Sequence, residues 1–290
     1  MSDETVFSLQ QGTGPLLFSM PHVGTHLPAD IRPQLSETGL AVDDTDWHIE
    51  ALYDFAIGLG ASYLQPTCSR YVVDLNRPAD GANLYPGQNT TGLCPLTTFD
   101  GVPLYRDACE PDEAETQRRL ALYWHPYHKA LQAELARIKA RHGYALLWEA
   151  HSIRSVIPRL FEGALPVFNF GTADGASCDP AVAQGLLATV QARMPDLPAV
   201  LNDRFKGGYI TRTYGNPAQG VHAVQLELAQ RGYMEEVPPY ALDDQRVARL
   251  KPVLHGSDLI TGLYTASTMV DSVLNSKITS PASTAPSEIP

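Results

Sequence analysis

Short apolar runs recur along the chain and are separated by longer segments with helical spacing. The runs that predict strands are residues 15–20, 69–75, 144–150 and 222–228. Several of them are continuously apolar, as expected for strands covered on both faces. Residues 45–59 and 113–140 instead repeat apolar side chains at helical intervals. This alternation predicts an α/β fold with a central sheet flanked by helices.

Two segments lack these patterns. Residues 81–106 are crowded with Gly, Pro, Asn and Thr, which predicts a long irregular loop of the kind that often borders a binding site. Residues 266–290 lose periodicity and are rich in Ser, Thr and Pro, which predicts a disordered tail. Because no internal repeat or linker interrupts the preceding sequence, we expect one domain over residues 1–265.

Composition narrows the class of protein. The chain has 290 residues, of which 44% are hydrophobic and 18% charged, as in ordinary soluble proteins. It has no apolar run near the ~20 residues of a membrane span and no secretory signal pattern, so we expect a cytoplasmic protein without a membrane partner. A net charge of −11 without a dense Lys/Arg run argues against nucleic acid as a partner. The four cysteines form no CxxC pair, which favours reduced structural thiols.

Two histidines follow predicted strands. His22 comes just after residues 15–20, and His151 comes directly after residues 144–150. Because ligands gather beyond the carboxyl ends of strands in α/β sheets, we expect both side chains to share a crevice. A catalytic zinc needs three protein ligands and an open position for water, and imidazole suits it. A single histidine is more often a buried hydrogen-bonded side chain, so the prediction depends on the combination.

The acidic segment DDTDWHIE offers the third ligand. Its candidates are Asp43, Asp44, Asp46, His48 and Glu50. We favour Asp46, although capping of the following helix would account for one or two of these acids. A separate carboxylate, Glu227, lies among apolar neighbours of the last predicted strand, where burial is costly unless the group is bonded or functional.

Arginine-containing clusters predict a small acidic substrate. The candidate residues are Arg70, Asn76 and Arg77 in SRYVVDLNRP and Gly208 and Arg212 in KGGYITRTYG. The planar guanidinium group binds carboxylates through two parallel hydrogen bonds, and glycine permits close backbone approach. A surface Arg–Asp pair is the alternative for the first cluster.

Together these segments resemble the N-formylglutamate amidohydrolase family, whose fold and site are similar to those of zinc carboxypeptidases and aspartoacylases. The matching stretches are PHVGTHLP, DDTDWHIEALYDFA, SRYVVDLNRP, LWEAHS, FKGGYITRTYG and VQLELAQRGYM. The resemblance implies a zinc-carboxypeptidase-like single domain with a mixed sheet. It also implies hydrolysis of N-formyl-L-glutamate to L-glutamate and formate, a late step of histidine breakdown.

The same resemblance assigns roles to site residues. It implies that His22 and His151 bind one divalent metal, with zinc favoured, and that Glu227 is the catalytic glutamate. Arg70, Asn76 and Arg77 match a group that polarises the carbonyl and binds the substrate carboxylate. We expect Arg70 to stabilise the oxyanion, and Asn76, Arg77 and Arg212 to hold the two carboxylates.

One position departs from the carboxypeptidase pattern. In those enzymes the second ligand is a glutamate three residues after the first histidine, but Thr25 stands here. An acid from the next helix must replace it, so Asp46 is the expected ligand and Asp44 is held in reserve.

Two other functions stay open at this point. The same metal centre would serve a deacylase of another N-acyl amino acid or a small carboxypeptidase. A non-catalytic binding module for an acidic metabolite would use the arginines and need no metal. The sequence leaves the oligomeric state open.

Overall fold

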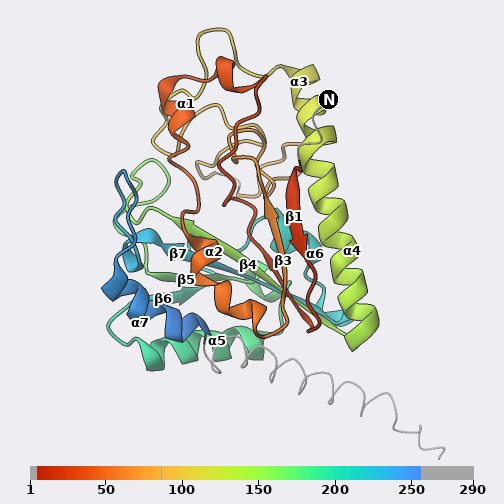
Figure 1. The fold of residues 1–290 in the computed structure, drawn as a ribbon. Coiled ribbons are helices and arrows are strands. Elements are labelled where there is room, and N and C mark those ends of the chain that lie inside the picture. The colour runs from red at the N-terminus through yellow and green to blue at the C-terminus, as the bar shows by residue number, and fades with distance from the viewer. Residues whose placement is uncertain (1–4, 86, 256–290) are drawn as a thin grey trace, which may run out of the picture.

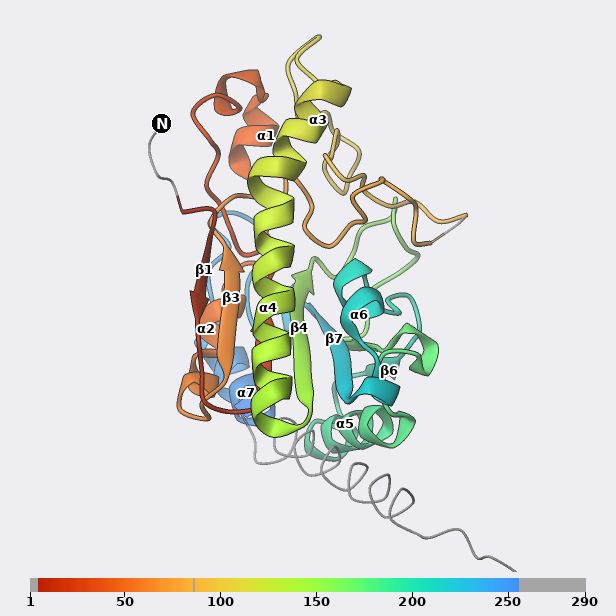
Figure 2. The same ribbon diagram turned by 90° about the vertical axis from the view of Figure 1, so that its right-hand side faces the viewer.

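The computed structural model describes residues 5–85 and 87–255, which form a seven-stranded sheet with helices on both faces (Figure 1, Figure 2). The strands, in sheet order, are β1 (Phe7–Gln10), β3 (Ser62–Pro66), β2 (Leu16–Ser19), β4 (Ala145–Ile153), β7 (Val221–Ala229), β5 (Phe168–Gly171) and β6 (Ala199–Leu201). The strands β3, β2, β4 and β7 are parallel, whereas β1 and β5 pair antiparallel to their neighbours β3 and β7. The expected α/β fold with a mixed sheet is therefore confirmed. The predicted tail at residues 266–290 lies outside the described residues.

Helices cover the sheet in two layers. The helices are α1 (Glu37–Ala41), α2 (Ile49–Leu52), α3 (Glu113–Arg119), α4 (His125–His142), α5 (Pro180–Arg193), α6 (Tyr209–Tyr214) and α7 (Asp244–His255). One apolar core lies between the sheet and α2, α5 and α7, and a second lies between the sheet and α4 and α6. Figure 2 shows α4 and α6 in front of the sheet and α7 behind it. None of the described helices is long and apolar enough to cross a membrane.

The predicted helical segments are present with interruptions. Residues 113–140 form α3 and α4, joined by a π-helical turn at Leu120–Trp124. Residues 45–59 contain only the short α2 and a 3₁₀ turn at Asp54–Ile57. Apolar spacing found both segments, but it did not show where the backbone changes its hydrogen-bonding pattern.

The predicted strand at residues 69–75 is wrong, because this segment is irregular. Its carbonyl groups accept hydrogen bonds from side chains of distant segments in place of a neighbouring strand. Arg119 donates to the carbonyl of Val72 at 3.0 Å. His128 Nε2 lies 2.9 Å from the carbonyl oxygen of Leu75. Side chains of α3 and α4 therefore satisfy the backbone of this buried segment. An apolar run in the sequence does not show which groups will bond to its backbone.

The loop predicted at residues 81–106 is confirmed. Its described residues form no helix and no named strand. Figure 2 shows this part of the chain beyond the carboxyl end of β4, on the same side of the molecule as α6. The loop thus lies at the sheet edge where side chains from the parallel strands emerge.

The register of β4 and β7 brings polar side chains together. His151 is the direct neighbour of Glu227, and Glu149 is the direct neighbour of Gln225. Since successive side chains of a strand point to opposite faces, these four residues share one face. The opposite face of both strands is apolar and packs into the larger core. The carboxyl halves of two central strands therefore present a polar surface toward one site.

Candidate active site

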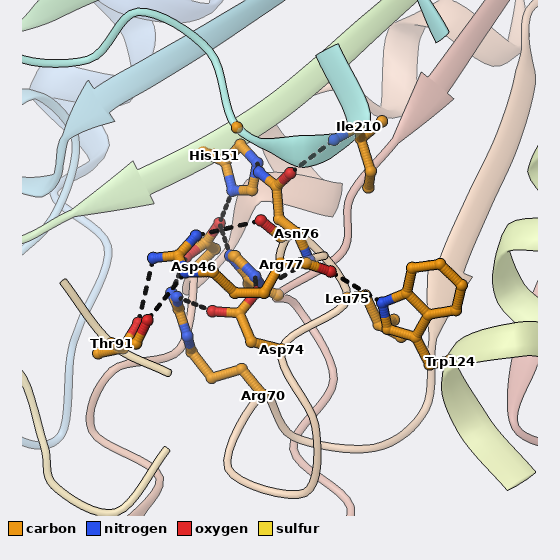
Figure 3. Close-up of polar contacts among 12 residues, drawn as sticks. Asp46, Arg70, Asp74, Leu75, Asn76, Arg77, Thr91, Trp124, His151 and Ile210 are labelled. Carbon is orange, nitrogen blue, oxygen red and sulfur yellow. Dashed lines mark hydrogen bonds and ion pairs between the residues drawn. The ribbon is translucent and has the colours of Figure 1, made fainter. Parts of the chain in front are cut away.

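Three buried side chains converge beside the carboxyl ends of the central strands. His22 follows β2, Asp46 precedes α2, and His151 lies within β4. His151 was expected just beyond its strand, but pairing with β7 extends β4 to Ile153. The rings of His22 and His151 have centroids 4.8 Å apart. Asp46 Oδ2 lies 2.8 Å from His151 Nδ1 and 3.7 Å from His22 Nδ1 (Figure 3).

A second carboxylate fixes the orientation of each histidine. Asp74 Oδ1 lies 2.8 Å from His22 Nε2, and Glu149 Oε1 lies 2.9 Å from His151 Nε2. Because a carboxylate oxygen accepts hydrogen bonds, each Nε2 donates to its carboxylate, and a metal ion bound on the Asp46 side would then take the lone pair of each Nδ1.

These donor atoms fit a divalent metal ion. His22 Nδ1 is buried and has no hydrogen-bond partner among the described residues, as expected of an atom that binds a metal ion. The candidate ligand atoms of His22, Asp46 and His151 all lie within 4.8 Å of one another. Two imidazole nitrogens and one carboxylate are a common ligand set for catalytic zinc, with the fourth position left to water. The structure thus brings together the three residues that the sequence predicted as ligands.

The reserve ligand Asp44 has a different role. Its Oδ2 accepts a hydrogen bond of 2.8 Å from the backbone of Phe99. The ring of Phe99 in turn lies 4.9 Å from the guanidinium carbon of Arg70. Asp44 therefore supports the loop that covers Arg70 and does not join His22, Asp46 and His151, the candidate metal-binding group.

Glu149 is a site residue that the sequence interpretation missed. It is fully buried, and its carboxylate accepts hydrogen bonds from the backbone NH of Thr211 at 3.0 Å, from the Thr211 hydroxyl and from His151. A signal for it was present, because Glu149 and His151 are two residues apart in a strand and so share a face.

Opposite charges compensate within this group. Burial alone would raise the pKa of Asp46, but the hydrogen bond from His151 and the nearby His22 ring hold it below its usual value. Burial likewise opposes ionisation of Asp74, yet the charges of His22 and Arg70 keep its pKa well below the usual value. For His151, Asp46 and Glu149 outweigh burial and raise the pKa. The site therefore favours the ionised forms of Asp46 and Asp74, and a carboxylate must be ionised to bind a metal.

Glu227 differs from these carboxylates. It lines the cavity beside His151, and its side chain accepts no hydrogen bond from the described residues. Burial raises its pKa to about 8. A carboxylate with these properties can exchange a proton near neutral pH, as a general base must.

A cavity with about 600 Å³ of unfilled space, part of it open to solvent, adjoins the metal-binding group and Glu227. Its wall includes Arg70, Arg77 and Arg204. Arg70 forms an ion pair of 2.7 Å with Asp74, and its other terminal nitrogen lies 3.9 Å from Asp46. This places one guanidinium group directly beside the predicted metal ligands (Figure 3).

Asn76 and Arg77 occupy the inner wall. Asn76 Nδ2 lies 3.0 Å from His151 Nε2, while its Oδ1 accepts from the backbone of Ile210 at 2.9 Å. Arg77 donates to the carbonyl and hydroxyl oxygens of Thr91 at 2.9 and 3.2 Å (Figure 3). Both predicted substrate-binding residues therefore face the cavity.

The segment KGGYITRTYG places Gly208, but not Arg212, in the cavity wall. Gly208 lines the cavity, and a Cβ there would meet the Asn76 side chain at 2.3 Å, so only glycine fits. Arg212 is exposed and absent from the cavity wall; its Nε donates to the carbonyl of Gly207 at 2.7 Å. Arg204, which no sequence pattern singled out, lines the cavity instead.

Known proteins resemble this chain over most of its length. A family described as N-formylglutamate amidohydrolase matches residues 14–234. An N-formylglutamate deformylase of Pseudomonas aeruginosa is 58% identical over 238 residues, or 82% of this chain and 89% of that protein. An N-formylglutamate deformylase of Pseudomonas putida is 54% identical over 237 residues, which cover 82% of this chain and 88% of that protein. The crystal structure of N-formylglutamate amidohydrolase from Ralstonia eutropha JMP134 has a TM-score of 0.75 at 25% identity, covering 89% of this chain and 98% of that one.

Proposed function

The chain belongs to the N-formylglutamate amidohydrolase family, and we propose that it hydrolyses N-formyl-L-glutamate to L-glutamate and formate. The observation that carries the proposal is the buried group of His22, Asp46 and His151, placed beside Glu227 in an arginine-lined cavity. The reaction fits a late step of histidine degradation in the cytoplasm.

The metal in this proposal is a single divalent ion, with zinc favoured. His22 Nδ1, Asp46 Oδ2 and His151 Nδ1 would hold it, while Asp74 and Glu149 keep both rings in the required tautomer. When bound, the ion would act as a Lewis acid toward water and the formyl carbonyl.

The side chains of the protein carry out the proton transfers. Glu227 takes a proton from the attacking water as the water oxygen bonds to the formyl carbon. The same carboxylic acid then protonates the amide nitrogen as the C–N bond breaks, which releases the free amine and formic acid, and the formic acid ionises to formate by giving its proton to the amine or to water. Arg70 donates hydrogen bonds to the oxyanion that develops, an interaction of about 3 kcal/mol in comparable sites. Asn76 and Arg77 hold a carboxylate of the substrate.

Steady-state turnover of N-formyl- and N-acetyl-L-glutamate tests the proposal. The wild type should prefer the formyl substrate, and Glu227→Gln should keep its metal but lose turnover by about 100- to 10,000-fold, the usual contribution of a general base. The exposed Glu162→Gln is the matched control and should retain wild-type rates.

Three results would contradict the proposal. Equal turnover of the acetyl substrate would indicate a broader N-acyl deacylase. Full activity in Glu227→Gln would remove Glu227 from the role of base. Binding of the acidic ligand without metal or turnover would indicate a non-catalytic binding module.

A further inference from the structure

Two guanidinium groups in the cavity wall lack a carboxylate partner among the described residues. All hydrogen bonds of the Arg77 side chain go to neutral oxygens of Thr91 and Asn76. Those of Arg204 go to the carbonyl oxygens of Leu160 at 3.1 Å and Asn89 at 3.4 Å. Arg70, in the same wall, is by contrast neutralised by Asp74. The cavity wall therefore holds two guanidinium groups that form no ion pair with an acid of the described residues.

These two charges repel each other. Burial lowers the pKa of Arg204; Tyr85 and Glu227 oppose this shift, and the nearby positive charge of Arg77 adds to it. A half-buried cation next to a like charge costs free energy unless an anion joins it. A ligand with two negative charges would compensate both arginines at once.

Arg204 and Arg77 lie at different depths. Arg77 follows Asn76, whose amide contacts His151, and the Trp124 indole donates to the Arg77 carbonyl at 2.9 Å. Arg204 instead bonds to half-exposed Leu160 and exposed Asn89. The contacts of Arg77 thus place it next to the candidate metal-binding group, and those of Arg204 place it on the solvent side of the cavity.

Aromatic rings hold Arg204 in this position. Its guanidinium carbon lies 5.1 Å from the ring centre of Phe205 and 5.9 Å from that of Tyr85. Tyr85 is itself fixed, because its hydroxyl donates to the carbonyl of Gly207 at 2.8 Å. The charge is therefore oriented before a ligand binds, which reduces the entropy lost on binding.

We propose that Arg204 binds the side-chain carboxylate of the substrate and so selects N-formyl amino acids with an acidic side chain. Arg77 binds the α-carboxylate, which is closer to the formyl amide. This inference rests on the proposed function and replaces Arg212, whose guanidinium is engaged with Gly207, as the second anchor. An uncharged side chain would leave Arg204 without a counter-ion.

The test compares kcat/KM for N-formyl-L-glutamate and N-formyl-L-glutamine, which differ in that one charge. Arg204→Met should lower kcat/KM for the glutamate substrate by about 10- to 150-fold, as expected for loss of a hydrogen bond between charged groups. It should change kcat/KM for the glutamine substrate less than about threefold, because that substrate has no side-chain carboxylate for Arg204 to bind. Arg204→Lys keeps the charge and should recover part of the preference. The exposed Arg249→Met, in α7, is the matched control and should behave like the wild type.

Each other outcome has a defined meaning. Equal losses on both substrates, or no loss in Arg204→Met, would overturn the inference while wild-type turnover leaves the proposed function intact. Selective loss of the glutamate substrate in Arg212→Met would also overturn it, because the second carboxylate would then lie at Arg212. Failure of the wild type to hydrolyse either substrate would refute the proposed function and this inference with it.

Discussion

Replacing Glu149 with glutamine tests whether the metal centre depends on the tautomer of His151. The wild-type carboxylate accepts hydrogen bonds from His151 and twice from Thr211. A glutamine offers one carbonyl oxygen, and its NH₂ group can only donate. If the oxygen stays with Thr211, the NH₂ faces His151 Nε2 and favours a proton on Nδ1, the atom that should bind metal.

The magnitude follows from these contacts. Loss of such a supporting carboxylate typically weakens metal binding by about 10- to 100-fold, which corresponds to about 1.4–2.7 kcal/mol. A buried donor left unsatisfied costs about 1–3 kcal/mol of folding stability in addition. Glu149→Gln should therefore bind metal more weakly and also unfold more easily as the apoprotein.

Glu134→Gln separates these two effects. Glu134 is also buried, and its carboxylate accepts from Ser62 at 2.6 Å, Gln11 at 2.9 Å and Arg137 at 2.6 Å. It contacts none of the predicted metal ligands, so its substitution should lower stability without changing metal affinity.

The assay is a competition titration of zinc against a chromophoric chelator, together with thermal unfolding of the apoproteins. Only Glu149→Gln should lose metal affinity, although both variants should melt earlier than the wild type. Wild-type affinity in Glu149→Gln, or an equal loss in Glu134→Gln, would refute the assigned tautomer. Saturating zinc should restore most of the turnover of Glu149→Gln, because Glu227 is unchanged.

Two further predictions concern the metal and the pH dependence of folding. A strong chelator should abolish turnover and lower the melting temperature, measured by an activity assay and by calorimetry. Stoichiometric zinc should restore both. Turnover that survives complete metal removal would refute the metal-dependent mechanism. Hydrogen bonds from Arg118 and Arg119 hold the pKa of Glu115 at about 2, below its usual 4.5. Because the folded pKa is the lower one, this contribution to stability is present above about pH 4.5 and is lost as the pH falls toward 2. Glu115→Gln should flatten the fall of the urea midpoint over that range, and an unchanged slope would contradict the assignment.

The features that the sequence predicted depend on local patterns. The segment before α2 held Asp46, and the first apolar run ended just before His22, so both were found by position alone. Glu149 could have been found by the two-residue spacing that it shares with His151. Arg204 could not, since its proposed role depends on the contact with Tyr85 and on the lack of an ion pair among the described residues, which only the folded chain reveals.

The strand predicted at residues 69–75 is wrong, yet Arg70 from this segment lines the cavity beside the predicted metal ligands. Its apolar residues are buried as expected, but its backbone bonds to side chains of α3 and α4. In a strand, Arg70 and Asp74 would also lie on one face, but the three residues between them would be forced to alternate between the two faces. The irregular backbone lets Arg70 and Asp74 meet without that constraint.

The Arg–Asp pair that the sequence offered as a surface alternative is in fact present, between Arg70 and Asp74. The pair is buried and not on the surface, because the side chains of Arg70 and Asp74 are only 7% and 0% exposed. Asp74 also bonds to His22. A surface pair contributes little to stability, whereas removing one partner of a buried pair costs about 3–5 kcal/mol. The pair therefore links Arg70, the proposed oxyanion-binding group, to the predicted metal ligand His22, so a change at Asp74 should disturb both at once.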